Sequence, residues 1–141
     1  MDISHNTKLE TLDCYWTNIQ ELDISNNIAL TKLTCGNDKL KSIDLNNNLE
    51  LVSVQCIDSP ITSLDVSKLA KLKELHCYNC RLFALDITNN PLLEEIRVGN
   101  QKDENQNNIE LTLTLTSAQN EQFSDMLLGY NNEHITTHVQ D

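Results

Sequence analysis

Four cysteines lie at a constant spacing along the chain. Cys14, Cys35, Cys56 and Cys77 are 21 residues apart, and Val98 takes the next place in the series. A fixed period of this length is typical of repeat proteins, in which each unit stacks only on its neighbours. The chain is therefore predicted to form a solenoid, a shape that usually works through the surface it displays.

The period extends well beyond the cysteines. Five windows align without a gap and begin at Leu9, Leu30, Leu51, Leu72 and Leu93. Places one, four, six and eleven of these windows are apolar, with Asp103 as the exception. Apolar and polar residues alternate around place four, which is the period of a half-buried strand. Each repeat is expected to add one short strand to a parallel sheet, with inward side chains stacked in columns.

The spacing resembles the leucine-rich repeat, L-x-x-L-x-L-x-x-N/C-x-L, with cysteine in place of the third leucine. A second phrase, such as Leu22-Asp23-Ile24-Ser25, is similar to the short bacterial repeats of Bacteroidetes surface proteins. The resemblance implies an α/β repeat fold over residues 1–103, a right-handed leucine-rich-repeat solenoid with one parallel β-sheet on the concave side. It also implies a bacterial cell-surface or secreted parent protein.

The ninth place departs from the family pattern of Asn or Cys. The chain has Thr17, Asp38, Ser59, Cys80 and Gln101 there. A regular asparagine ladder is therefore not expected at this place, although Thr, Asp and Ser can bond to nearby backbone. A unit of 21 residues is also too short for a long convex helix, so irregular, 3₁₀ or short extended structure is expected on that side.

Residues 104–141 are predicted to form a C-terminal capping segment. Apolar and polar residues alternate over 109–116 and predict a strand with one buried face. Ser117 is the expected N-cap of a helix over about 118–128, and a last short strand is expected near 134–139. Because an open solenoid leaves its final layer bare, this strand–helix–strand segment is the candidate cap.

The end of the predicted helix and the start of the chain each allow a further prediction. Gly129 is expected to end the helix, and Tyr130 extends its apolar face. At the other end, only eight residues precede Leu9, so the first layer is weakly covered. Either the chain is a piece of a longer protein, or this edge pairs with another molecule, including a second copy.

The cysteine column suggests zinc, but the expected geometry opposes it. Four rungs at about 4.8 Å spread the thiols over about 14 Å, whereas zinc needs four ligands at about 2.3 Å from one ion. Parallel Cβ vectors also suit disulfides poorly. The column is predicted to be a structural core ladder, and the C-x-x-C spacing of Cys77 and Cys80 follows from the repeat.

A second column consists of aspartates that point outwards. Its members are Asp23, Asp44, Asp65 and Asp86. Stacked carboxylates are typical Ca²⁺ ligands, which leaves calcium as an alternative. We expect instead that each aspartate bonds to backbone or to the following Ser, Thr or Asn within its own turn. No metal or cofactor is predicted.

Composition excludes several classes of partner. The formal net charge of −11 repels nucleic acid and anionic membrane surfaces. No stretch approaches the ~20 apolar residues that span a bilayer, and the first residues carry no secretory signal, which leaves the compartment open. No nucleophile, metal or phosphate-binding motif is present, and the cysteines are expected to be buried, so no enzymatic activity is predicted.

The outward residues of the predicted strands form the concave face, where solenoids commonly bind. Trp and Tyr are frequent in binding hot spots and lie on this face. The candidate ligand-binding residues are Asp13, Tyr15, Trp16, Gln55, Ile57, Asp58, Glu74, His76, Tyr78 and Arg97. An alternative role for Tyr15 and Trp16 is to shield the first repeat.

The predicted function is a protein–protein interaction module that binds a protein ligand through this concave face. A glycan-binding or adhesion module is an alternative, because the same exposed aromatics stack on sugar rings. A third possibility is a structural spacer without a ligand of its own.

Overall fold

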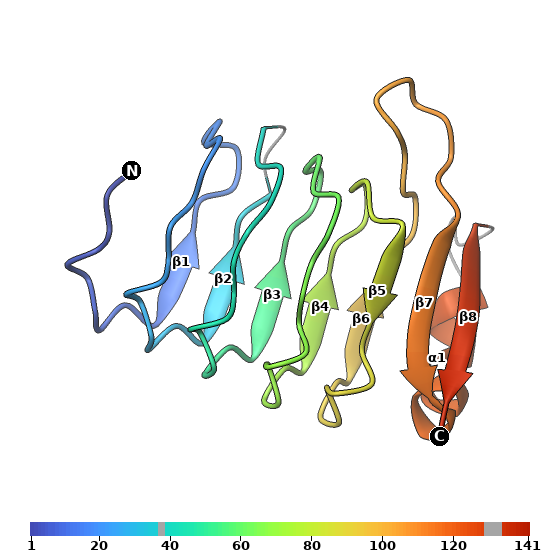
Figure 1. Cartoon of the computed structure of the whole chain (residues 1–141). Coiled ribbons are helices and arrows are strands. Elements are labelled where there is room, and N and C mark those ends of the chain that lie inside the picture. The colour runs from blue at the N-terminus through green and yellow to red at the C-terminus, as the bar shows by residue number, and fades with distance from the viewer. Residues whose placement is uncertain (37–38, 129–133) are drawn as a thin grey trace.

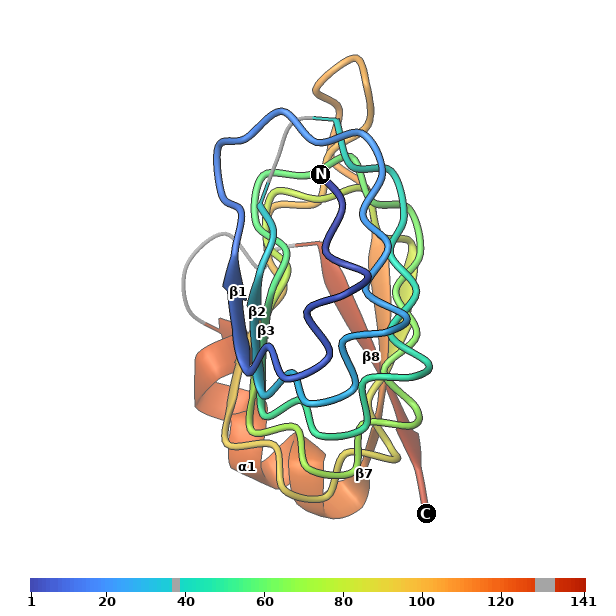
Figure 2. The same cartoon turned by 90° about the vertical axis from the view of Figure 1, so that its left-hand side faces the viewer.

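The structure is a computed structural model that describes residues 1–36, 39–128 and 134–141. Asp38, Gly129 and Tyr130 lie outside the described residues. The described part of the chain coils into a parallel-strand solenoid of about six turns, with a single helix near the C-terminus. Two sheets lie on opposite sides of the coil (Figures 1 and 2).

The larger sheet, here called sheet A, contains one three-residue strand from each of five repeats. Its strands are β1 (Thr11–Asp13), β2 (Lys32–Thr34), β3 (Ser53–Gln55), β4 (Glu74–His76) and β6 (Glu95–Arg97), all parallel and in that order. Each rung pairs with the next at a step of one repeat, so that Leu12 lies opposite Leu33 and Leu75 opposite Ile96. The predicted parallel sheet is confirmed, whereas the handedness of the coil stays a prediction.

The smaller sheet, sheet B, was not predicted. It contains β5 (Ala84–Asp86), β7 (Leu111–Thr116) and β8 (Ile135–Gln140), which are also parallel. Leu85 pairs with Leu113, a step of 28 residues where the repeats have 21. The seven extra residues are taken up around the loop over 101–108, which extends beyond the neighbouring turns in Figure 1. Elsewhere the convex side consists of turns and short extended segments, as expected.

The cysteine ladder forms part of the core. All five cysteines are buried free thiols, and the Sγ atoms of Cys35 and Cys56 are 3.3 Å apart. Leucine, isoleucine and valine columns complete the layers, and Leu30, Leu33, Leu51 and Leu72 are fully buried. The prediction that the thiols point inwards as small apolar side chains is confirmed for every cysteine of the column.

A ladder of buried asparagines runs along the other turn of the coil. Asn48 donates from Nδ2 to the carbonyl oxygens of Ile24 and Asn27, at 3.0 and 2.9 Å. Asn27 and Asn90 bond to the preceding turn in the same way. These amides supply donors to buried backbone carbonyls, which would otherwise lose hydrogen bonds on leaving water. This ladder was not predicted, because the family pattern places its asparagine at place nine of the repeat.

The ninth-place side chains bond to backbone in place of an asparagine ladder. Thr17 donates to the carbonyl of Cys14 at 2.6 Å, and the Cys80 thiol donates to the carbonyl of Cys56 at 2.8 Å. Gln101 donates to the carbonyl of Cys77 at 2.8 Å. Thr17 therefore shows the expected local backbone bonding, whereas Cys80 and Gln101 bond to carbonyls 24 residues earlier, in the preceding turn.

The outward aspartates hold the turns in which they lie. In each, Oδ1 accepts a hydrogen bond at 2.9 Å from the N–H two residues later, and the acceptors are Asp23, Asp44, Asp65 and Asp86. Hydrogen bonds from the side chains and amides of Ser25 and Ser67 lower the pKa values of Asp23 and Asp65. The structure confirms the expected role of these aspartates within their turns.

The C-terminal segment consists of β7, the helix α1 (Ser117–Leu128) and β8. The N-cap prediction of Ser117 is wrong. Thr116 caps the helix, because its Oγ1 accepts the N–H of Gln119 at 3.2 Å while Oε1 of Gln119 accepts the N–H of Thr116 at 2.9 Å. This reciprocal pair is a capping box. From α1, Phe123 is fully buried in the same core as the repeats.

Candidate binding face

Place eight of the repeats has a left-handed backbone. The φ angles are 60° at Trp16, 57° at Asp58, 54° at Asn79 and 58° at Asn100. Asn and Asp tolerate this region because their short side chains bond locally, whereas a bulky residue is strained there. Trp16 is therefore the exception in its column. Its backbone is strained by about 1–3 kcal/mol at a place where asparagine fits.

Trp16 is also the most exposed large apolar side chain among the described residues, at 75%. Tyr15 meets it edge to face, with ring centroids 5.6 Å apart and an interplanar angle of 86°. An indole this exposed covers little of the first repeat. This geometry argues against the shielding interpretation for Trp16 and leaves the ring available to a ligand.

Tyr15 has a different role from its neighbour. Its ring lies directly over Gly36, where an added Cβ would come within 2.2 Å of the ring and 2.5 Å of the Ile57 carbonyl oxygen. The phenol reaches across to the third repeat and donates to Oδ2 of Asp58 at 2.9 Å. This hydrogen bond raises the pKa of Tyr15. Tyr15 thus links the first three repeats, and its fixed ring supports the indole of Trp16.

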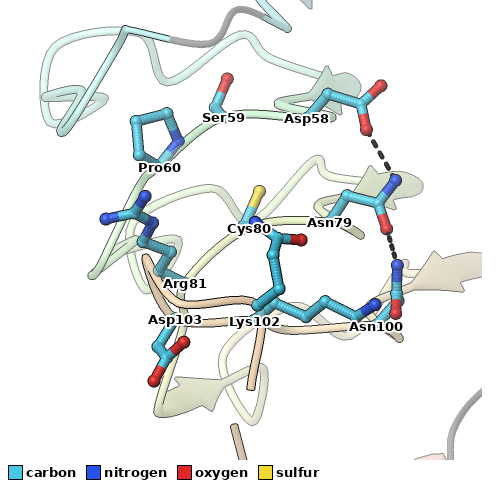
Figure 3. A pocket seen from close by; sticks show the side chains of 10 residues that line it. Asp58, Ser59, Pro60, Asn79, Cys80, Arg81, Asn100, Lys102 and Asp103 are labelled. Atoms are coloured by element: carbon cyan, nitrogen blue, oxygen red, sulfur yellow. Dashed lines mark hydrogen bonds between the residues drawn. The ribbon is translucent and has the colours of Figure 1, made fainter. Parts of the chain in front are cut away.

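A row of polar side chains continues from Asp58 along place eight. Asn79 donates from Nδ2 to Oδ1 of Asp58 at 2.6 Å, and Asn100 donates to Oδ1 of Asn79 (Figure 3). The row borders a polar pocket of about 400 Å³, to which Arg81 and Lys102 also contribute. Together with Tyr15, the row forms a continuous hydrogen-bonded line along one side of sheet A.

Charged residues on β4 and β6 form a cluster at the β6 end of the face. Oε1 of Glu95 lies 3.1 Å from Nε2 of His76 and 2.7 Å from a terminal guanidinium nitrogen of Arg97. Burial opposes the charge of Glu95, but hydrogen bonds and charges from Arg97 and His76 outweigh it and lower its pKa. Glu74 accepts a hydrogen bond from Ser53 at 2.9 Å.

The ten candidate residues all lie on strands of sheet A or directly after them. Asp13, Trp16 and Arg97 are exposed, and the other seven are partly buried. The structure joins Tyr15 and Asp58 directly and leaves Asp13 and Arg97 at opposite ends of the sheet. The candidate set omitted Asn79, Asn100 and Glu95. Asparagine at place eight was the sequence signal for the first two, because Asn favours a left-handed turn.

Metal-ligand groups and reactive thiols are two further kinds of site that the described residues can be checked for. No group of three or more His, Cys, Asp or Glu side chains in this part of the chain is arranged to hold a metal ion. Burial raises the pKa of Cys14 to about 11 and of Cys80 to about 12. Such thiols are almost fully protonated near neutral pH and are therefore poor nucleophiles. Within the described ranges, no helix is both long and apolar enough to cross a membrane.

Comparison with solved structures finds a similar solenoid. The functional domain of InlJ from Listeria monocytogenes, a leucine-rich-repeat protein whose structure includes a cysteine ladder, matches with a TM-score of 0.70 and 26% sequence identity. The match covers 100% of this chain and 38% of that chain, so the present chain spans well under half the length of the InlJ domain in that structure. No family model matches the sequence, and no curated protein matches it. The similarity supports a repeat-protein interaction module in general.

Proposed function

We propose that this protein binds a protein ligand through the concave face of sheet A, with Trp16 as the anchor. The observation that carries the proposal is an exposed tryptophan in a left-handed backbone conformation. That conformation favours asparagine and strains tryptophan, so the stability of the fold does not account for the residue. Strained residues of this kind cluster at functional sites, and tryptophan is the residue type most enriched in binding hot spots.

The surroundings of Trp16 support the same role. Tyr15 is fixed by Asp58 and by its contact over Gly36, so the indole projects from a rigid base. A rigid aromatic anchor loses little conformational entropy on binding. The place-eight row and the Glu95 cluster add polar groups around it, which is the usual arrangement of an apolar anchor within a polar rim.

A glycan is the second candidate ligand. The observation that favours it is the exposed indole of Trp16 on the same side of sheet A as the polar row Asp58–Asn79–Asn100. Sugars stack on aromatic rings and bond to carboxylate and amide groups. A structural spacer without a ligand gives no reason for an indole that is 75% exposed on a strained backbone.

The wider setting follows from the leucine-rich-repeat resemblance. We propose a bacterial parent protein of the cell surface or a secreted one, in which this chain is one interaction segment. In it, β7, α1 and β8 act as the cap of the array, because Phe123 is fully buried against the core. The outer edge of β1, which pairs with β2 on one side only, is a candidate for self-association.

The experiment that tests the anchor compares two exposed aromatics. Trp16→Ala removes the proposed anchor, and Phe83→Ala removes a side chain that is 59% exposed just before β5, on the side of sheet B. Immobilised wild-type and variant proteins are compared for capture of purified extracellular proteins and on a glycan array. We expect Trp16→Ala to lose at least tenfold in affinity for a captured protein while Phe83→Ala retains it. Equal binding by both variants contradicts the proposal, and signal on the glycan array alone favours the second candidate.

A separate measurement addresses the β1 edge. Sedimentation velocity over a hundredfold range of concentration shows whether the protein associates. A species that stays monomeric throughout rules out pairing through this edge.

A further inference from the structure

The far edge of β6 carries unpaired backbone groups. Within sheet A, the amide at place six donates to the next rung, as in Cys56 to His76 and Cys77 to Arg97, both at 2.8 Å. The amide at place eight does the same from Asn79 to Gly99, at 3.2 Å. The carbonyl at place two accepts from the next rung, as Lys73 does from Glu94 at 2.8 Å. The same three hydrogen bonds join the other neighbouring rungs of sheet A wherever both bonding residues are described.

In the last repeat the same three groups are the N–H of Val98, the N–H of Asn100 and the C=O of Glu94. Among the described residues, none of the three has a hydrogen-bond partner. Val98 is only 1% exposed, and an unsatisfied donor in a buried position is costly. Two donors and one acceptor therefore lie along β6 in the order that an added parallel strand requires.

A groove gives access to this edge. It has a volume of about 1000 Å³ and lies between β4 and β6 on one side and α1 on the other. Ile96 and Val98 contribute to its floor, and Met126 and Leu127 form the wall on α1. Met126 is 44% exposed, and its flexible thioether adapts to different apolar partners.

We propose that an extended segment of a partner protein binds in this groove and adds a parallel strand to β6. Strand addition of this kind takes its affinity from main-chain hydrogen bonds and its specificity from alternate side chains. The register follows from the preceding rungs, where Glu74 lies opposite Glu95 and Leu75 opposite Ile96. The partner residue beside Glu95 faces the concave side, and the partner residues beside Ile96 and Val98 face inwards.

The lining determines the chemistry of the partner. Among the described residues that line the groove there are four carboxylates, at Glu74, Glu94, Glu95 and Asp125, and one cation, at Arg97. A Lys or Arg beside Glu95 is complementary to this charge, while the two inward places require apolar side chains. The sequence of the partner segment is therefore basic–apolar–any–apolar. The second repeat of this chain has the same pattern at Lys32, Leu33 and Cys35, which provides a natural probe.

This inference rests on the proposed function, since it names the class of protein ligand, but it uses a different part of sheet A. Trp16 follows β1, at the opposite end of the sheet from β6. A failure of the Trp16 anchor and a failure of strand addition are therefore distinguishable, because each has its own variant.

The test uses the heptapeptide LTKLTVG, which has the sequence of residues 30–36 with valine in place of cysteine. It is titrated into ¹⁵N-labelled full-length protein, and amide chemical shifts and amide hydrogen exchange are followed. We expect saturable shifts and slower exchange at Val98 and Asn100, with no effect on β1. LTELTVG, which places a carboxylate beside Glu95, is expected to bind at least tenfold more weakly. A peptide N-methylated on the amides that face β6 is expected to lose binding.

Matched protein variants complete the test. Asp125→Lys is expected to weaken binding of LTKLTVG at least fivefold, whereas Glu121→Lys, an exposed residue of α1 outside the groove, leaves it unchanged. Trp16→Ala also leaves it unchanged. Absence of binding at millimolar peptide, equal binding of the lysine and glutamate peptides, or shifts confined to β1 or β8 would overturn the proposal. If hydrogen exchange at the Val98 amide of the free protein slows as the protein concentration rises, the edge pairs with a second copy of this chain. That result would also overturn the proposal.

Discussion

The repeats and the C-terminal segment perform the same structural tasks with different residues. In the repeats, Asn48 donates to two carbonyls of the preceding turn. At the end of the array Gln119, from α1, donates to the carbonyls of Ile87 and Asn90 at 2.8 and 3.2 Å. In the core, Phe123 from the helix covers the final aliphatic layer. The solenoid therefore requires a hydrogen-bond donor or an apolar side chain at a given point in space. The 21-residue repeat places such groups there in most turns, and the helix does so at the end of the array.

The largest expected effect comes from truncating core side chains in the two regions. Phe123→Ala removes a fully buried ring and should destabilise the protein by about 3–5 kcal/mol, and Leu75→Ala in β4 should cost about 2–5 kcal/mol. Urea denaturation followed by circular dichroism measures both. If the two regions form one cooperative unit, each variant shifts the same single transition. An early transition in Phe123→Ala alone, with the repeats unaffected, would break the equivalence.

The ladder amides give the next largest effect. Asn48→Ala and Gln119→Ala each leave two backbone carbonyls without their side-chain donor, which should cost about 1–3 kcal/mol in unfolding free energy. Asn46→Ala is the control, because Asn46 is exposed and its backbone N–H bond to Asp44 survives the change; it should stay within about 0.5 kcal/mol. A cost for Asn48 without one for Gln119 would show that the helix does not substitute for a repeat.

Alkaline pH tests the cysteine ladder, which the C-terminal segment lacks. The pKa of Cys14 is raised to about 11 in the folded protein and returns to its ordinary value on unfolding. Above that ordinary value the unfolded state binds fewer protons, so stability falls as pH rises from about 9 towards 11, by at most about 1.4 kcal/mol per pH unit for this thiol. Urea midpoints between pH 8 and 10.5 measure the slope. Cys14→Val, the residue type found at Val98, should reduce it, and an unchanged slope would contradict the assignment.

The smallest expected effect is a gain in stability. Trp16→Asn places at φ 60° a residue that tolerates this conformation, as Asn79 and Asn100 do in later repeats. The melting temperature should rise, with a stabilisation of about 0.5–1 kcal/mol. Phe83→Asn, a change of the same type at an exposed aromatic outside the left-handed column, should give no gain. A loss of stability in Trp16→Asn would mean that the indole contributes to the fold and would weaken its role as an anchor.

The repeats could be predicted from the sequence because each place recurs. Strand positions, inward thiols and the Asp turns all follow from the same alignment. The asparagine ladder was not predicted because Leu69 interrupts the column of Asn27, Asn48 and Asn90, which stands among many exposed asparagines. Sheet B was not predicted because the 28-residue step from Leu85 to Leu113 breaks the 21-residue period. The choice between adjacent hydroxyls for the N-cap depends on Gln119, which stands three residues after Thr116.

The candidate site was only partly accessible to sequence analysis. The repeat alignment predicted Trp16 as part of the concave face, but a backbone angle is not visible in an alignment, so its strain was not predicted. The different role of Tyr15 depends on Gly36 and Asp58, one and two repeats away. The open edge of β6 was also not predicted, since it exists only because a helix follows where the period would place another strand.

The regular rungs of sheet A also act as a ruler. From β1 to β6 the sheet has four steps of about 4.8 Å, so its two ends are about 19 Å apart. A monosaccharide can reach Trp16 or the groove beside α1, but not both. An extended peptide advances by about 3.3 Å per residue and needs about six residues to cover the same distance. Ligand length alone therefore separates molecules that bind one end of the face from those that bind along all of it.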